Sequence, residues 1–528
     1  MSNNFYERND YVLNHDINKY FEEVLWMTDD EFEQWVRDFR RVIAEVWDTH
    51  GNPPRVGWME DEIVEQFNKL SAFPSHKLLF TDEYTGEENI IRPTSNLGNA
   101  ANQWFPTMMK TKIVYNKIES AVSIYDHFVR EDLFDKVHLY AKRHFKRDSF
   151  YNHGLPVRVN NKVEVNGQVH LTTTGTEFIK WFENNIRDYD THDYWLKPDK
   201  DVDYSGYRTD IQEEKVDWIR LSREEIADLN IPDKCKVNMV DDYDIYQVIL
   251  FKKKQKVFPA GFKAFRVSWC QYAVNFPPLV AKFLYERYTN HIKDQDRINI
   301  FDPSSGWGGR ILGAMSVRDD RNIHYIGTDP NTDHNCLDSD GHRTTKYEEL
   351  AKFFNTKTYR AYGLEPHTNT YDVYQLGSEV IGDDPEFKKK YEKDLDLVFT
   401  SPPYFAKEAY SEDETQSYKK FGEYMVWVEG FLRPTLETAV KNLKSDRYLL
   451  WNIADAKFGS DMLPLEEDSR KILEELGMEY VETMKLALAQ MPGGNRIDKE
   501  TGLPNVKNFC KVNNLWLKYE PIFVYRKP

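Results

Sequence analysis

The chain has 528 residues and a formal net charge of −17, because 87 acidic residues outnumber 70 basic ones. This length predicts two or three domains, and a hydrophobic content of 40% is enough for ordinary globular cores. Four scattered cysteines exclude a disulfide framework and a cysteine metal site, and the absence of a leader or a long apolar run predicts a soluble, cytoplasmic protein without membrane segments.

Helical patterns begin the chain. Thr28 to Glu31 has the form of a capping box, which predicts a helix reaching about Trp47. A second amphipathic segment runs from Glu60 to Leu70, and aromatic and aliphatic residues at helical spacing continue from 104 to 148. Residues 1–150 are therefore predicted to be a mainly helical N-terminal region.

Residues 151–255 are predicted to be an α+β region. Residues 157–171 alternate and turn at Asn-Asn and Asn-Gly, which predicts a three-stranded meander. Ser222 to Glu225 caps a further helix, and residues 241–253 have the pattern of a strand. After residue 255, only loop 489–514 leaves room for target recognition. Residues 151–255 are therefore expected to serve target recognition or oligomerisation.

Charge patterns in the first half suggest partners without defining them. A chain this acidic must gather its basic residues locally to contact nucleic acid, and the candidates are residues 252–256 and 138–147. Such runs more often form solvated faces. Pro198-Asp199 with Glu213 to Lys215 fits a loose nuclease pattern, but the charged flanks disfavour it.

A nucleotide-binding pattern follows. Asn275 to Pro278 opens a helix with proline at its start. Residues 297–314 are an apolar strand, an acid, a glycine-rich turn and a helix, as in the first unit of a doubly wound sheet. Residues 324–331 form a second strand that ends in Asp329, an acid placed to accept from ribose hydroxyls.

The apolar strand 395–400 ends on Ser401, Pro402, Pro403 and Tyr404. Each proline fixes its own φ and lacks an N–H, so the carbonyls of Ser401 and Pro402 are rigid acceptors beside an aromatic ring. A planar ring that bears an NH₂ group suits this cluster. The ring can stack on Tyr404 while the Ser401 hydroxyl and the Pro402 carbonyl accept the amino protons.

The remaining elements follow in a regular order. An amphipathic helix is predicted from about Phe421 to Leu443, a strand over 447–455 and a short helix from Ser469 to Leu476. Residues 480–488 and 515–527 are predicted to form a closing strand pair.

Taken in this order, the segments resemble the S-adenosylmethionine (SAM)-dependent amino methyltransferases of DNA. Ser401 to Tyr404 matches the catalytic motif of that family, and Asp302 to Gly308 matches its cofactor motif, with Ser304 replacing the usual phenylalanine. The resemblance covers roughly residues 260–528. It implies an α/β fold, with a Rossmann-like methyltransferase domain over residues 256–528 built on a mixed seven-stranded sheet.

The resemblance also implies the site residues. The catalytic group would be Ser401, Pro402, Pro403 and Tyr404, with Tyr404 and Phe405 stacking on the target base and no metal required. The residues implied to bind SAM come from three segments: Asn275, Phe276, Pro277, Asp302, Pro303, Ser304, Ser305, Gly306, Trp307, Gly308, Asp329 and Pro330.

The implied substrate is DNA, with the target base flipped out of a duplex or already single-stranded. Serine before Pro-Pro-Tyr favours cytosine N4 over adenine N6. Methylation of cytosine carbon 5 is excluded because no cysteine follows a proline, and residues 333–342 lack calcium-loop spacing and are predicted to be a polar loop. RNA, a protein glutamine amide, and a degenerate fold that only binds nucleic acid or a partner remain alternatives, and a homo-oligomer and a restriction partner remain open.

Overall fold

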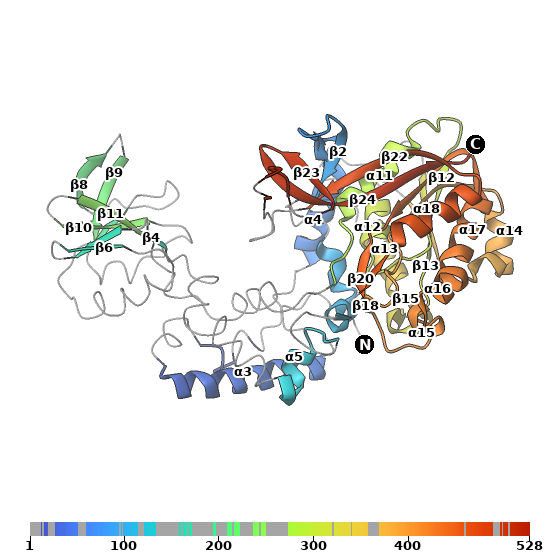
Figure 1. Cartoon of the computed structure of the whole chain (residues 1–528). Coiled ribbons are helices and arrows are strands. Elements are labelled where there is room, and N and C mark those ends of the chain that lie inside the picture. Colours follow the sequence, from blue (N-terminus) through green and yellow to red (C-terminus); the bar gives the residue numbers. More distant parts are fainter. Residues whose placement is uncertain are drawn as a thin grey trace. The chain divides into compact units, whose positions relative to one another are not determined.

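A computed structural model of the chain (Figure 1) describes residues 12, 15–19, 27–50, 60–93, 97, 99–113, 121–133, 273–318, 322–338, 340–356, 369–458, 461–488, 497–498, 500–504 and 507–528, together with the backbone of the strands between 158 and 249. The chain divides into two compact units. One contains Gly57–Ser123 and Tyr272–Pro528, and the other contains Asn9–Val56 and Ile124–Gln271.

The first unit is built on a ten-stranded sheet, and seven of its strands run in the order β22-β24-β19-β17-β12-β13-β16. The five strands from β16 to β19 are parallel, and β24 is antiparallel to both β19 and β22. This mixed, Rossmann-like α/β sheet is the predicted fold class. Its strands are β12 (Arg297–Asp302), β13 (Asn322–Thr328), β16 (Thr370–Tyr374), β17 (Leu395–Thr400), β19 (Leu443–Asn452), β22 (Glu479–Ala487) and β24 (Leu515–Arg526).

Continuous apolar runs form the central strands because both faces of the sheet are covered. Successive side chains alternate between the faces: Ile300 belongs to one core cluster and Phe301 to the other. The first cluster includes residues of α4 (Glu60–Ala72), α11 (Pro278–Thr289), α12 (Gly309–Ser316) and α13 (Lys346–Thr356). The second includes residues of α14 (Pro385–Tyr391), α17 (Arg433–Asn442) and α18 (Leu465–Glu475).

The helix predicted from Phe421 to Leu443 is confirmed, with an irregular centre. It consists of α16 (Tyr424–Trp427), a π-helical turn η7 (Val428–Leu432) and α17. Pro434 lies in the first turn of α17 and has no N–H to donate to the carbonyl four residues earlier. The helix therefore changes its hydrogen-bond spacing just before the proline.

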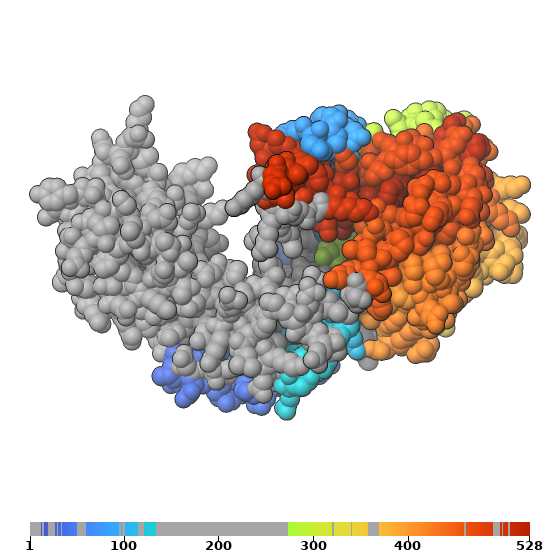
Figure 2. All heavy atoms as spheres, viewed as in Figure 1, coloured from blue at the N-terminus to red at the C-terminus, as the bar shows by residue number. Residues whose placement is uncertain are grey.

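The segment before residue 123 adds two strands to the sheet. β1 (Leu79–Thr81) and β2 (Glu88–Ile91) form an antiparallel hairpin, and β2 pairs in parallel with β22. In Figure 2 the blue atoms of this hairpin lie beside the red atoms of the last strands. The structure thus groups part of the predicted helical region with the Rossmann-like half, although the functional division at residue 256 stays a prediction.

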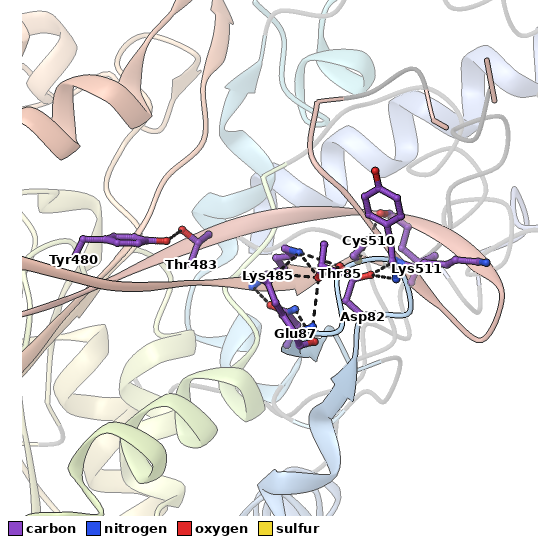
Figure 3. A network of polar contacts seen from close by, with 11 residues as sticks. Asp82, Thr85, Glu87, Tyr480, Thr483, Lys485, Cys510 and Lys511 are labelled. Atoms are coloured by element: carbon purple, nitrogen blue, oxygen red, sulfur yellow. Dashed lines mark hydrogen bonds and ion pairs between the residues drawn. The ribbon is translucent and has the colours of Figure 1, made fainter. Parts of the chain in front are cut away.

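A buried lysine fastens this hairpin to the sheet (Figure 3). Lys485 of β22 donates to Asp82 at 2.9 Å, Thr85 at 3.1 Å and Glu87 at 2.7 Å. Asp82 is fully buried and also accepts from the backbone N–H of Lys511. These contacts join segments that lie 400 residues apart in the sequence, as the separation of Lys485 and Thr85 shows.

The second unit confirms two local predictions. The capping box is present, because the Thr28 hydroxyl accepts from the Glu31 N–H and the Glu31 carboxylate accepts from the Thr28 N–H, at the start of α3 (Asp29–His50). Two of the predicted strands pair as expected: β5 (Lys162–Val165) is antiparallel to β6 (Gln168–Leu171).

The first strand of the predicted meander pairs elsewhere. β4 (Arg158–Val159) pairs with β11 (Asp244–Ile249) in a six-stranded sheet of order β4-β11-β10-β7-β9-β8, so the meander prediction is wrong in that part. The other strands of this sheet are β7 (Tyr194–Leu196), β8 (Arg208–Glu213), β9 (Val216–Leu221) and β10 (Lys236–Asp241).

Between 99 and 133 the described residues form short helical segments and a two-residue strand, not long helices: η2 (Asn99–Gln103), η3 (Pro106–Lys110), β3 (Lys112–Ile113) and α5 (Asp126–Val129). The helix predicted at Ser222 and the basic runs at 138–147 and 252–256 lie outside the described residues. Within the part of the chain that is described, no helix is both long and apolar enough to cross a membrane.

Candidate active site

The predicted site residues converge on one cavity of about 320 Å³ in the first unit. It lies where β12, β13 and β17 end, at the carboxyl edge of the parallel strands, which is the usual ligand position in open α/β sheets. Most of the predicted residues line it: Asn275, Phe276, Pro277, Pro303, Ser304, Gly306, Trp307, Asp329, Pro330, Ser401, Pro402, Pro403 and Tyr404.

The glycine-rich turn between β12 and α12 has the backbone form that its sequence predicts. Gly306 and Gly308 have φ angles of +60° and +74°, a region that favours glycine, and Gly308 is the N-cap of α12. A Cβ at Gly308 would lie 2.4 Å from the Phe105 ring. Both glycines are therefore required by the conformation of the turn.

Asn275 locks the turn in place. Its side-chain oxygen accepts from the Gly309 N–H at 3.1 Å, and its amide donates to the Trp307 carbonyl at 2.7 Å. These two hydrogen bonds hold the segment that precedes α11 against the glycine-rich turn. Phe276 and Trp307 extend its apolar surface along the cavity, where Trp307 meets the Tyr410 ring edge to face at 5.4 Å between centroids.

Asp302 does not line the cavity, although it was predicted among the cofactor-binding residues. It is fully buried, and its carboxylate accepts from Arg310 at 2.8 Å, Tyr325 at 2.6 Å and Thr400 at 2.7 Å. These partners come from α12, β13 and β17. Asp302 thus joins the strand ends and the helix that form the cavity floor, so it is a positioning residue.

Ser305 and Gly308 also lie behind the cavity wall. Ser305 is 1% exposed, its hydroxyl lies 3.1 Å from the Tyr325 hydroxyl, and its N–H donates to the Thr328 carbonyl at 3.0 Å. Together with Asp302 and Phe405, they are the predicted site residues that do not line the cavity.

Asp329 lies at the end of β13 and lines the cavity as predicted. Its carboxylate accepts from the N–H groups of Gly306 at 3.1 Å and Asn331 at 3.0 Å. Burial raises the pKa of Asp329 to about 6, although these hydrogen bonds oppose the shift. The carboxylate is a fixed acceptor at neutral pH, with lone pairs left for a ligand.

The Ser-Pro-Pro-Tyr turn faces Asp329 and the glycine turn from the end of β17. The Tyr404 hydroxyl interacts with the Ser401 side chain and the Ala454 backbone, while burial raises the pKa of Tyr404 far above its usual value. Tyr404 is therefore neutral at physiological pH and is held by its hydroxyl end. Its fixed ring and the acceptors of Ser401 and Pro402 lie in the same cavity.

Phe405 does not stack into the cavity. It is 4% exposed and has a φ of +53°, and its ring packs edge to face against Tyr424 and Trp427 in the core below the turn. This φ turns the side chain away from that of Tyr404, so the expected stacking role of Phe405 has no support in the structure.

Several lining residues were not anticipated. Arg92, Glu408, Tyr410, Asn452 and Glu520 line the same cavity. Burial raises the pKa of both Glu408 and Glu520, and the Tyr410 hydroxyl hydrogen bonds to Glu408. The segment ending at Lys527 was interpreted only as the closing strand, and no local motif marks Arg92 or Glu408.

His334 and Tyr347 support the opposite wall. His334 contacts Tyr347 at 2.8 Å and Thr107 at 3.3 Å, and burial lowers the pKa of His334 to about 4. Tyr347 also donates to the Gly306 carbonyl. Tyr347 thus holds the glycine-rich turn through the Gly306 carbonyl, and the neutral His334 positions Tyr347.

Residues 333–342 were predicted to be a polar loop, but they include strand β14 (Asn335–Leu337), which pairs with β15 (Arg343–Thr345), so that prediction is wrong in this part. Asp338, Asp340 and His342 offer ligand atoms within 4.8 Å of one another, but Asp338 accepts from the backbone N–H groups of Asp340 and His342. These bonds account for the cluster as an Asx-type turn.

No protein-family model matches the chain, and no curated protein matches it. Among solved structures, it is similar to a provisionally assigned DNA modification methylase from Thermus thermophilus complexed with S-adenosyl-L-methionine, at 20% identity and a TM-score of 0.18. That match covers 29% of this chain and 52% of the other, so it spans about half the length of that protein.

Two further structures are methyltransferases of other kinds. A SAM-dependent O-methyltransferase from Thermotoga maritima is 12% identical, with 65% of this chain and 97% of that chain covered and a TM-score of 0.25. A precorrin-6y C5,15-methyltransferase from Geobacter metallireducens is 13% identical, with 48% and 87% covered and a TM-score of 0.24. TM-scores in this range transfer no role to any residue.

Proposed function

We propose that the chain is a SAM-dependent methyltransferase that methylates the exocyclic amino group of a base in DNA, with cytosine N4 favoured over adenine N6. One observation carries the proposal: the Ser401 to Tyr404 turn opens into the same cavity as Asp329 and the glycine turn. A cofactor pocket and a rigid set of amino-group acceptors therefore share one space.

The cavity fits SAM on the chemistry of its own residues. Asp329 provides a carboxylate for the two ribose hydroxyls, and the bend at Gly306 presents backbone near it. Phe276, Pro277 and Trp307 provide apolar surface for the adenine ring. When bound there, SAM would supply an electrophilic methyl group.

The residues of the chain would then act on the acceptor nitrogen. An aromatic amino group is a weak nucleophile because its lone pair is delocalised into the ring. The Ser401 hydroxyl and the Pro402 carbonyl accept its protons and favour a tetrahedral nitrogen. Tyr404 stacks on the ring and orients the nitrogen, which contributes through positioning. Such a pocket requires a base outside the helical stack.

The test is transfer of labelled methyl from SAM to unmethylated genomic DNA by purified protein, followed by nucleoside mass spectrometry. We expect 4-methylcytosine. The Ser401→Ala variant should lose most of this product while SAM affinity is unchanged, and Ser445→Ala, at an exposed serine of β19 away from the cavity, is the matched control.

The other outcomes separate the alternatives. A 6-methyladenine product would keep the reaction and correct the base. SAM binding without label in DNA would redirect the assay to RNA and to protein glutamine amides. A folded protein that binds no SAM would contradict the proposal and favour a degenerate binding module.

A further inference from the structure

The hairpin of β23 (Phe509–Val512) and β24 has one buried face and one accessible face. Side chains alternate between the two faces along each strand. The buried face consists of Cys510, Val512 and Leu517. The accessible face consists of Phe509 and Lys511 on β23, with Lys518 and Trp516 directly opposite them on β24. Lys518 is exposed and the other three side chains are partly exposed, so this face is open to a partner.

Three aromatic rings gather on the accessible face. Tyr84, from the loop between β1 and β2, lies 5.7 Å from Phe509 and 5.4 Å from Trp516, measured between ring centroids. Phe509 and Trp516 are themselves 5.2 Å apart. Tyr84 is 52% exposed, although a ring of this size is usually covered. A cluster of rings that stays accessible indicates an interaction surface.

Two lysines border the rings. The Lys511 ammonium lies 5.7 Å from the centroid of the Trp516 ring, and its side chain extends away from the buried polar network in Figure 3. Within the part of the chain that is described, the ion pairs include neither Lys511 nor Lys518. The neighbouring carboxylate of Glu83 accepts from the Asn514 N–H at 3.1 Å. An aromatic–lysine face is thus formed by Tyr84, Phe509, Lys511, Trp516 and Lys518.

This face continues into the cavity. Glu520 on β24 and Leu486 on β22 are paired, and both line the cavity. Lys518 and Trp516 precede Glu520 at intervals of two residues, so they lie on the same face of β24. Four residues of a strand span about 13 Å, and one strand of B-DNA carries a phosphate about every 3.4 Å. The aromatic–lysine face therefore extends a few nucleotides beyond the cavity.

The chemistry of the face fits an unpaired strand of nucleic acid. Bases stack on aromatic rings and phosphates pair with ammonium groups, so a strand uses both kinds of side chain at once. An apolar surface of a protein partner would instead leave the two ammonium groups desolvated and unpaired.

We propose that the aromatic–lysine face binds the unpaired nucleotides that flank the target base in a DNA strand. This inference rests on the proposed function, which puts the target base in the cavity, and it adds the surface that holds the rest of the strand. Stacking and phosphate contacts tolerate any base, so the face contributes affinity without sequence preference.

The experiment measures binding of the full-length protein to a fluorescein-labelled single-stranded DNA of about 12 nucleotides, by fluorescence anisotropy. Tyr84→Ala should weaken binding by about 5- to 150-fold, the loss of one base stack, whereas Tyr84→Phe keeps the ring and should stay within a few-fold of wild type. Lys511→Gln and Lys518→Gln should each lower the slope of log affinity against log salt concentration by about 0.7.

The matched controls are Tyr480→Ala, at a tyrosine that is 54% exposed, and Lys441→Gln on the exposed face of α17. Both should leave the affinity and the salt slope unchanged, and the unfolding midpoint and SAM affinity should be the same in all variants. An unchanged affinity in Tyr84→Ala would overturn the inference, and so would unchanged salt slopes in both lysine variants. Loss of self-association in Tyr84→Ala, with DNA affinity intact, would assign the face to a second copy of the chain.

The binding assay requires no methyl transfer, so the two proposals fail in different ways. A wild-type protein that binds the strand through this face but transfers no methyl group to DNA would overturn the proposed function and leave a nucleic-acid-binding face. Methyl transfer to DNA by the wild type, with binding unaffected in the variants of the face, would overturn only this inference.

Discussion

Tyr404 is the residue whose ring the proposed reaction uses most directly. Tyr404→Ala removes the stacking surface, worth about 1–3 kcal/mol per base, so kcat/KM should fall by roughly 5- to 150-fold. Tyr404→Phe keeps the ring and should stay within a few-fold of wild type. Methyl transfer kinetics with saturating SAM provide the measurement.

Tyr480→Ala is a suitable control. Tyr480 is 54% exposed and lies near the start of β22, whereas the cavity is lined by Leu486 near the end of that strand. Methyl transfer by Tyr404→Ala at the wild-type rate would show that the proposed target pocket is wrong.

The proposed contact of Asp329 with the ribose predicts that SAM binding depends on pH. The pKa of Asp329 in the protein is about 6, and only the ionised carboxylate accepts from both ribose hydroxyls. SAM affinity should therefore be constant above pH 7 and weaken below pH 6, approaching a tenfold loss per pH unit. Titration calorimetry between pH 5 and 8 measures this.

The Asp329→Asn variant should bind SAM about 10- to 100-fold more weakly at pH 8 and show no such pH dependence. Asp383→Asn, a change at an exposed carboxylate paired with Lys388, should leave the profile intact. A pH-independent SAM affinity in the wild type would exclude the ribose contact.

Among the elements, the β1–β2 hairpin depends on one buried charge. Lys485→Ala leaves Asp82 buried and unpaired, so we expect a loss of about 3–5 kcal/mol in the free energy of unfolding. Glu87 contributes little because its side chain is 62% exposed. Urea unfolding measures the change.

The Asp82→Asn, Lys485→Met double variant should lose less than the single Lys485→Ala variant, since no unpaired charge remains. Lys441→Ala on the exposed face of α17 is the control. Equal losses in the single and double variants would mean that packing, and not charge, holds the hairpin.

The elements also show what a sequence can predict. β12, β13 and β17 are buried apolar runs with glycine, acid or proline at their ends, so their type and their shared edge follow from local patterns. The β1–β2 strands are three and four residues long and join the sheet only through pairing with β22. Short strands stabilised by distant partners carry no local signal.

The same reasoning applies to the site. Ser401, Asp329 and Gly306 belong to motifs and were predicted. Arg92 and Glu520 reach the cavity from the hairpin and the last strand, so their position depends on the complete sheet. Phe405 was misplaced because its positive φ, and hence its direction, cannot be read from an apolar residue after a turn.

At the scale of the whole molecule, the described part of the cavity lining comes from the first unit. Each described lining residue lies within Gly57–Ser123 or Tyr272–Pro528. A chain of residues 57–123 joined by a flexible Gly/Ser linker to residues 272–528 should therefore fold and bind SAM within a few-fold of the full-length affinity.

The rate of DNA methylation by this shortened chain then shows which part of the chain recognises the target. The sequence predicts that recognition lies before residue 255 or in loop 489–514. If the second unit recognises DNA, methyl transfer should fall by more than tenfold while SAM affinity persists, because phosphate and base contacts are removed from an intact catalytic cavity. Binding of SAM is measured by calorimetry and DNA affinity by fluorescence anisotropy, with the full-length chain as control. A shortened chain that methylates DNA at the full rate would assign recognition to the first unit and leave the second unit a structural or oligomerisation role.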